Sequence, residues 1–176
     1  MKYMIVSDIH GDAICTEKFL SIFESEKCDH LIILGDILYH GPRNDLPDGY
    51  NPKKVISLLN AYKEKITAIN GNCDAEVDQM VLDFPILPDP QHVILNGIET
   101  VLTHGHKCNF DDPQGLILHG HTHILRAEKY ENGTIIVNPG SVSIPRGGNP
   151  KTFAFFYKNA ISIHDFELRT IKDVIV

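Results

Sequence analysis

Tryptophan is absent from this 176-residue sequence, and aromatic residues make up only 8% of it. Long hydrophobic runs are also missing, because no apolar stretch approaches the roughly 18 residues that a membrane-spanning helix needs. The N-terminal apolar segment turns polar at Ser7 and Asp8, which is too early for a signal peptide. We therefore expect a globular protein that resides in the cytoplasm and does not bind membranes.

A surplus of positive charge is lacking too, since 23 acidic residues outnumber 16 basic ones and give a net charge of -7. This balance argues against stable binding of nucleic acid, whose non-specific affinity comes mainly from neutralised phosphates. The four cysteines, Cys15, Cys28, Cys73 and Cys108, show no paired spacing of the zinc-ribbon or redox type. We expect reduced thiols, with Cys15 and Cys28 as small core residues.

Hydrophobic patterning in the first half alternates between strands and helices. Strands are predicted at residues 2–7, 30–34 and 66–69, and helices at about 14–23, 52–62 and 74–84. Pro52 suits the first turn of the second helix, and Asp74 suits the N-cap of the third. This β-α-β-α-β-α order implies a parallel sheet with helices packed on its faces.

The second half is dominated by strand patterns joined by turn residues. Asn96-Gly97 joins segments 93–95 and 98–103 in the strongest hairpin signal of the chain. Further strands are predicted at 116–118, 125–130, 134–137, 152–157 and 160–164. The length suits one domain covering residues 1–176. We predict an α/β fold in which two packed mixed β-sheets form a sandwich flanked by helices.

Six short clusters of metal-ligand residues run down the chain, each just after an apolar run. They are Asp8-Ile9-His10, Gly35-Asp36, Gly71-Asn72-Cys73-Asp74, Thr103-His104-Gly105-His106, Gly120-His121-Thr122-His123 and Asn138-Pro139-Gly140-Ser141. Ligands of open α/β sheets bind at the carboxyl ends of the strands, so residues at those ends are expected to converge. Oxygen and imidazole donors that meet there predict a metal centre.

Each cluster taken alone has an ordinary structural explanation. An Asp-x-His pair is common, and Gly-Asp is a frequent turn dipeptide. Asn72 can cap a turn, and His104 can be a hydrogen-bonded histidine at a strand end. Their joint occurrence in order, each after a predicted strand, favours the metal centre over these separate explanations.

The ordered clusters resemble the signature of the calcineurin-like metallophosphoesterases, which reads Asp-x-His, Gly-Asp, Gly-Asn-x-Asp, His and Gly-His-x-His. Two longer strings, residues 35–44 and 138–145, are similar to those of the small bacterial YfcE-type phosphodiesterases. The resemblance covers residues 1 to about 164. It implies that one metal is held by Asp8, His10, Asp36 and His123, and a second by Asp36, Asn72, His104 and His121. Asp36 would bridge the two divalent ions. By the same analogy we expect Mn²⁺, with Zn²⁺, Fe²⁺ or Ni²⁺ as alternatives.

Such a centre would hydrolyse a small-molecule phosphate ester by in-line attack of a hydroxide that bridges the two ions. Two Asp charges and one hydroxide leave two divalent ions with about one net positive charge, which attracts a phosphate ester. The resemblance favours diesters over monoesters. A non-catalytic scaffold, as in the retromer subunit that resembles these enzymes, a phosphomonoesterase and a nuclease are the alternatives. The complete ligand set favours an enzyme over a scaffold, while homo-oligomer formation stays open.

The candidate catalytic residues are Asp36, Asn72, Cys73, Asp74 and Arg43. Many relatives carry His where this chain has Cys73, and that imidazole assists phosphate binding or leaving-group protonation, so the general acid is left unassigned. Asp74 is expected to orient a ligand. Arg43 either grips a phosphate oxygen or forms an ion pair with Asp45 or Asp48. Residues 107–119 form a shorter connection than in relatives, through a trimmed rim or an incomplete chain.

Overall fold

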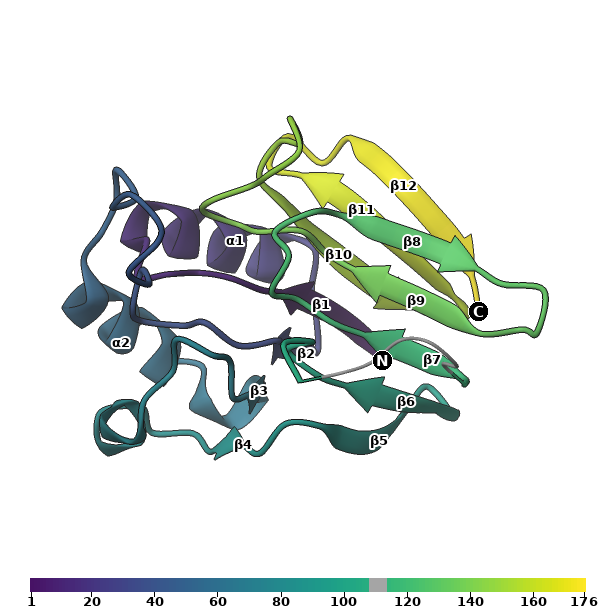
Figure 1. Cartoon of the computed structure of the whole chain (residues 1–176), viewed down its shortest axis with the longest axis horizontal. Coiled ribbons are helices and arrows are strands. Elements are labelled where there is room, and N and C mark those ends of the chain that lie inside the picture. The colour runs from purple at the N-terminus through teal and green to yellow at the C-terminus, as the bar shows by residue number, and fades with distance from the viewer. Residues whose placement is uncertain (108–113) are drawn as a thin grey trace.

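The structure is a computed structural model that describes residues 1–107 and 114–176, and its two β-sheets pack face to face (Figure 1). The first sheet contains β1 (Lys2–Val6), β2 (His30–Ile33), β3 (Ile66–Ile69), β4 (Ile86–Leu87), β10 (Thr152–Tyr157), β11 (Ala160–Asp165) and β12 (Thr170–Ile175). Its strand order is β12-β11-β10-β1-β2-β3-β4. The second sheet contains β5 (Gln91–Leu95), β6 (Ile98–Leu102), β7 (Leu116–Leu118), β8 (Arg126–Lys129) and β9 (Ile135–Asn138), in the order β5-β6-β7-β9-β8. Both sheets mix parallel and antiparallel pairs, so the predicted fold class is confirmed.

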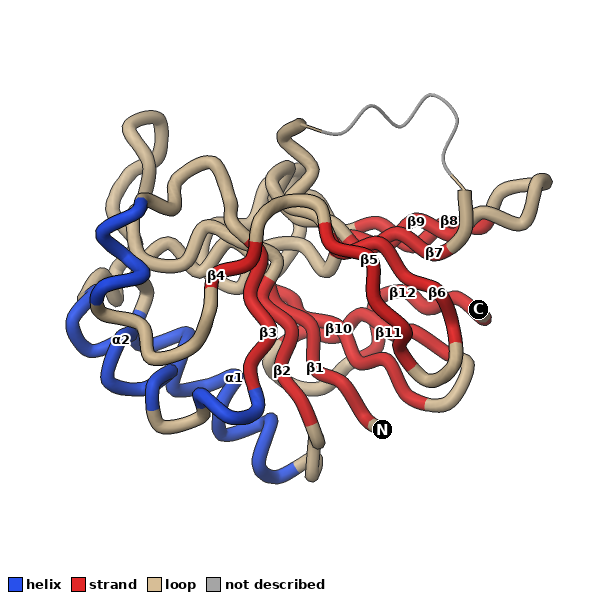
Figure 2. The backbone as a smooth tube through the Cα atoms, turned by 90° about the horizontal axis from the view of Figure 1, so that it is seen from below, coloured by secondary structure: helices blue, strands red, loops and turns tan. Residues whose placement is uncertain are grey.

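Helices cover only the first sheet in the part of the chain that the structure describes (Figures 1 and 2). They are α1 (Ala13–Ser25) and α2 (Pro52–Asn60), with the short 3-10 helices η1 (Lys63–Lys65) and η2 (Glu76–Met80). Asn51 caps α2 by accepting a hydrogen bond from the Lys54 amide, and Pro52 occupies the first turn as expected. None of these helices is long and apolar enough to cross a bilayer, within residues 1–107 and 114–176.

Two apolar layers hold the sandwich together. One lies between the helices and the first sheet, where Phe19 and Phe23 of α1 pack with Leu59 of α2. The other lies between the sheets, where Ile32 and Phe156 pack against strands of the second sheet. Each fully buried side chain of this size stabilises the fold by about 1.5–3 kcal/mol. The two layers make the central strands rigid supports for the loops that follow them.

The parallel strands of both sheets end near one another. Strands β1, β2 and β3 are parallel neighbours in the first sheet, and β6, β7 and β9 are parallel neighbours in the second. The loops after them leave from the end of the sandwich opposite the N-terminus (Figure 2). All candidate ligands lie in these loops or at these strand ends, so the topology converts residues far apart in sequence into neighbours.

The predicted third helix at 74–84 is wrong, because only Glu76–Met80 forms a short 3-10 helix. Side chains compete there for the backbone groups that a helix would use. The Gln79 amide donates to the carbonyls of Leu82 and Phe84 and accepts from the Ile86 amide. These bonds draw the chain into the short edge strand β4. Residues 108–113, which include Cys108 and part of the short connection noted above, lie outside the described residues.

Candidate metal centre

The backbone at the strand ends adopts an unusual conformation at five candidate ligands. Positive φ angles of 55°, 48°, 56°, 68° and 60° occur at Asp8, His10, Asp36, His121 and His123, respectively. Left-handed φ at non-glycine residues costs free energy and gathers at functional sites, where the surrounding structure enforces it. The conformation turns each side chain sharply out of its strand direction. The protein is therefore less stable than it would be with ordinary φ angles here, and in return these five side chains are held in defined directions.

Three imidazoles are fixed by backbone carbonyls. The Nδ1 atoms of His10, His104 and His123 lie 2.8, 2.6 and 2.6 Å from the carbonyl oxygens of Tyr39, Leu34 and Ile144, respectively. A carbonyl accepts only, so each Nδ1 carries the proton and donates it. In the neutral form of each ring, Nε2 then has a free lone pair, as a metal-binding histidine requires.

A first group of donors is formed by Asp8, His10 and His123. Asp8 Oδ1 lies 3.8 Å from His10 Nε2 and 3.3 Å from His123 Nε2, and the two Nε2 atoms are 3.2 Å apart. Asp8 is fully buried, and its Oδ1 has no hydrogen-bond partner within the described residues. A buried carboxylate oxygen facing two nitrogen lone pairs is unfavourable unless a cation lies between them.

Asp36 joins this group to a second one. Its Oδ2 lies 3.7 Å from His10 Nε2 and 3.4 Å from His104 Nε2. The Asn72 Oδ1 atom is 3.0 Å from His104 Nε2 and 2.7 Å from His121 Nδ1. Ligands bound at about 2.1 Å stand about 3 Å from one another around an ion, so these separations suit divalent ions. All seven predicted ligands are brought together, with Asp36 in the central position.

The charges of the site are strongly coupled. Burial alone would raise the pKa of Asp36, but hydrogen bonds from His104 and the Cys73 amide hold it well below its usual range. Burial likewise opposes ionisation of His104, yet Asp36 and Asp8 raise its pKa to about 9. The pKa of His10 is lowered, chiefly by burial. With this raised pKa, His104 would carry a second proton, on Nε2, at neutral pH, and a metal ion bound there would have to displace it.

Asp74 acts on the backbone of the site. Its carboxylate accepts hydrogen bonds from the amides of Asp36, Ile37 and Gly71, at 2.8, 2.7 and 2.7 Å. These bonds hold the loop after β2 against the loop after β3. Burial raises the pKa of Asp74 to about 6, despite the three amides that favour its charged form. The geometry agrees with an orienting role.

Replacing Asp74 by Asn should therefore loosen the bridging position without removing a ligand. One amide nitrogen would face backbone N–H groups, so at least one bond would be lost and a donor left opposite a donor. We expect the free energy of unfolding to fall by about 2–3 kcal/mol, measured by urea denaturation. The matched variant Asp173→Asn, on the exposed strand β12, should leave it unchanged. Equal stability of Asp74→Asn and the native protein would show that these hydrogen bonds do not hold the two loops together.

Cys73 lies beside the donors but holds its proton. Its Sγ belongs to a group with His10 and Asp36 whose possible ligand atoms lie within 4.8 Å of one another. Burial, followed by the nearby charge of Asp36, raises the pKa of Cys73 to about 12. A thiol with this pKa is neutral near pH 7 and is a poor proton donor to an alcohol. The sequence already placed Cys73 within a cluster of candidate ligands, and the structure brings its Sγ close to the donor atoms of His10 and Asp36.

A hollow of about 320 Å³ opens over the donors. Its lining includes Asp36, Asn72, Cys73, His121 and His123 from the cluster, together with Arg43, Asn44 and Arg146. Among the described residues, Arg43 forms no ion pair with Asp45 or Asp48, so the ion-pair explanation for Arg43 is not supported. Arg146 was not among the site residues predicted from the sequence. It directly follows the string 138–145, and the two glycines after it read as an ordinary loop.

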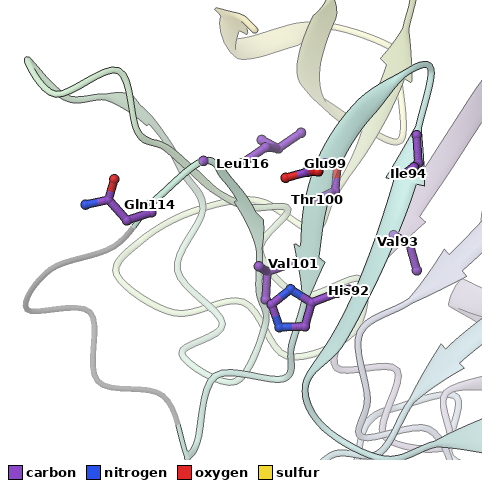
Figure 3. Close-up of a pocket in the computed structure, with 9 residues that line it drawn as sticks. His92, Val93, Ile94, Glu99, Thr100, Val101, Gln114 and Leu116 are labelled. Atoms are coloured by element: carbon purple, nitrogen blue, oxygen red, sulfur yellow. The ribbon is translucent and has the colours of Figure 1, made fainter.

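A separate hollow of about 530 Å³ lies on the outer face of the second sheet, where His92, Ile94, Glu99 and Val101 line it (Figure 3). It contains none of the clustered donors. Size alone would favour it as the site, but its single imidazole and single carboxylate provide no convergent set of ligands. The donor set at the strand ends is therefore the better candidate for the functional site.

Comparison with known proteins agrees with this geometry. The calcineurin-like phosphoesterase superfamily domain matches residues 1–159, which include every donor described above. The chain belongs to this superfamily. Members use divalent metals, and the Asp and His donors of this chain are compatible with a dinuclear site. The phosphodiesterase YfcE of Escherichia coli K12 is 46% identical over 169 residues, which cover 93% of this chain and 91% of that protein.

Several solved structures share the fold of this chain. The Escherichia coli phosphoesterase Yfce superposes with a TM-score of 0.94 and 42% identity, covering 99% of both chains. An archaeal phosphodiesterase gives a TM-score of 0.69 at 21% identity, covering 100% of both chains. A Vps29 mutant from Entamoeba histolytica gives 0.64 at 16% identity, covering 100% of this chain and 99% of that one. The last two similarities show the fold alone.

Proposed function

We propose that this protein is a metal-dependent phosphodiesterase whose centre is built by Asp8, His10, Asp36, Asn72, His104, His121 and His123. The observation that carries the proposal is the position of Asp36, whose Oδ2 stands within 3.7 Å of His10 Nε2 and 3.4 Å of His104 Nε2. A carboxylate so placed between two donor groups suits a bridge between two cations. Similarity to YfcE supports a diester as the substrate.

The bound ions would supply Lewis-acid polarisation of the phosphoryl oxygens and an activated water at neutral pH. The chain's own residues perform the other tasks. The buried carboxylates of Asp8 and Asp36 would hold the ions, and the carbonyls of Tyr39, Leu34 and Ile144 fix the rings of His10, His104 and His123 through their Nδ1 atoms, so that the Nε2 atoms face the centre. These fixed directions remove the need to reorganise ligands during the reaction.

Substrate contacts come from the exposed side of the hollow. Arg43 lines it, and no other protein group among the described residues engages its guanidinium, so it is available for a phosphate oxygen. Cys73, whose pKa is raised to about 12, lies far from the pKa that suits a general acid at neutral pH, so it would give little help to the departure of an alkoxide. Esters of acidic alcohols, such as aryl esters, should consequently react faster than esters of alkyl alcohols.

Metal-reconstituted protein should hydrolyse bis(4-nitrophenyl) phosphate with a kcat/KM at least about tenfold above that for 4-nitrophenyl phosphate, since tenfold corresponds to about 1.4 kcal/mol of transition-state discrimination. Release of 4-nitrophenol with Mn²⁺, Zn²⁺, Fe²⁺ or Ni²⁺ gives the measurement. A preference for the monoester would replace the diesterase proposal by a phosphomonoesterase. Metal binding without turnover of either ester would favour the scaffold.

The finer attributes of this function stay predictions. Mn²⁺ is preferred as the native ion by analogy with the family, and ion availability rather than affinity alone decides which metal is bound in the cell. A cytoplasmic location, one domain over residues 1–176 and assembly into a homo-oligomer are also predictions. The activity measurement with the four ions tests the preference for Mn²⁺, and light scattering tests the homo-oligomer.

A further inference from the structure

The hollow over the metal-site donors adjoins a second hollow. The second hollow has a volume of about 420 Å³ and is lined in part by Asp45, Asp48 and Lys151. Three residues line both hollows: Arg43, Asn44 and Arg146. A ligand with its phosphate at the metal centre can therefore extend past these three residues into the second hollow. A phosphodiester has two substituents on phosphorus, and one of them needs such a space.

The shared wall is tied to the metal ligands. The Arg146 amide donates to the His123 carbonyl at 3.0 Å, while the neighbouring Ile144 carbonyl accepts from His123 Nδ1. On the other side, the Asn44 amide group donates to the His40 carbonyl at 2.8 Å. A guanidinium nitrogen of Arg146 then donates to Asn44 Oδ1 at 2.8 Å and links the two loops. One edge of the guanidinium is thereby fixed, and its other N–H groups remain for a ligand.

The fixed charges of the second hollow balance. Lys151 is compensated, because its Nζ lies 3.5 Å from the buried carboxylate of Asp12. Arg43 and Arg146 supply two positive charges, against two negative charges from Asp45 and Asp48. In the described part of the chain, no protein partner engages the side chains of Asp45 or Asp48. Donors and acceptors are both available, and neither sign of charge is in excess.

We propose that this second hollow is the subsite for a neutral, hydroxyl-bearing substituent of the phosphodiester, and that Arg146 is the residue that positions it. Guanidinium donors and carboxylate acceptors together complement a hydroxyl group, which both donates and accepts. A second phosphate would meet the carboxylates of Asp45 and Asp48, and an aliphatic chain would displace water from these exposed polar groups without replacing its hydrogen bonds. Polyol and sugar substituents fit both requirements. The inference rests on the proposed diesterase activity and names its substrate class.

The test uses substrates that differ only in the retained substituent. 4-Nitrophenyl 2,3-dihydroxypropyl phosphate and 4-nitrophenyl propyl phosphate have the same leaving group, so the chemical step is matched. Native protein should prefer the dihydroxypropyl ester by about tenfold in kcat/KM, mainly through KM, because the hydroxyls pair with the subsite before and during reaction. Arg146→Gln should reduce this preference to about onefold to threefold, and Arg146→Lys should restore part of it.

Binding gives a readout that is independent of turnover. Isothermal titration calorimetry should show that glycerol 1-phosphate binds more tightly than propyl phosphate to native protein and that Arg146→Gln removes the difference. Arg169→Gln, in the distant turn before β12, is the matched control and should preserve it, because that side chain is 71% exposed and pairs with Asp165. Unchanged circular dichroism of Arg146→Gln would exclude misfolding as the cause.

The outcomes separate the two proposals. If both diesters are hydrolysed at equal rates by native protein, or if Arg146→Gln slows both equally, the subsite is refuted while the diesterase stands. If a 2-phosphoethyl ester is preferred over the dihydroxypropyl ester, the subsite takes anions and the neutral-substituent proposal is refuted. If neither diester reacts although 4-nitrophenyl phosphate does, the diesterase proposal itself fails.

Discussion

Asp36→Asn protein is expected to lose at least about a thousandfold in kcat on bis(4-nitrophenyl) phosphate with saturating Mn²⁺, because the carboxylate provides several kcal/mol of charge stabilisation between the two donor groups. The side chain keeps its shape, so packing is preserved. Oδ1 accepts from the Cys73 amide at 2.8 Å, and the carbonyl oxygen of Asn can retain that bond. The nitrogen of Asn would then replace Oδ2 beside His10 and His104, where a donor cannot bind a cation.

The matched control is Asp83→Asn. Asp83 is exposed on the surface, where its carboxylate lies 3.7 Å from Lys63 Nζ, and its loss should leave kcat unchanged. Measurement of bound metal by atomic absorption separates the two ways in which Asp36→Asn can act. We expect bound metal to fall below the two ions per chain of native protein. Turnover within tenfold of native protein would refute the bridging position of Asp36.

The convergence of the candidate ligands was predicted from the sequence more accurately than the local structure around them. The candidate ligands stand out because short polar clusters follow apolar strands, and the ends of parallel strands converge for reasons of topology alone. The left-handed backbone at Asp8, His10 and Asp36 could not be predicted, since Asp and His adopt it more often than most residues but still mainly occupy other conformations. Tertiary contacts impose it.

Glycine at position 71 shows how close these contacts are. A Cβ there would lie 2.2 Å from Asp36 Oδ1 and 2.5 Å from the Asp36 amide nitrogen, so only glycine lets the loop after β3 approach the central carboxylate. A glycine after a strand typically leaves space for another segment to approach closely. Which atom fills the space became evident only in the folded structure.

The wrong helix prediction and the features that were not predicted each have a physical cause. The side chain of Gln79 takes the backbone partners of the predicted third helix, and nothing in a hydrophobic pattern reveals such a bond. Strand β12 carries Lys172 and Asp173 and is mostly exposed, so its pattern lacks the alternation of a half-buried strand. Arg146 was missed because its role depends on Asn44, which lies 102 residues away in sequence.

Chelation of divalent ions is expected to lower the midpoint of thermal unfolding of native protein by about 5–10 °C. An ion present at a hundredfold excess over its Kd stabilises the folded state by about 2.7 kcal/mol, and 1 kcal/mol corresponds to about 2–4 °C in a chain of this length. The metal is expected to stabilise the fold because Asp8 and Asp36 are buried, at 0% and 2% exposed. Without cations, their repulsion and desolvation are not offset.

Asp8→Asn tests that source directly, with scanning calorimetry as the measurement. The variant removes one buried charge, so the downward shift caused by the chelator should shrink to less than about half of the native shift, because less binding energy is lost when the ions leave. The shift, rather than the absolute midpoint, is compared because Asn tolerates the left-handed backbone at this position about as well as Asp does. Asp83→Asn should show the full native shift. An unchanged midpoint of native protein after complete removal of metal would mean that Asp8 and Asp36 are stabilised by the protein alone, which would contradict the dinuclear centre.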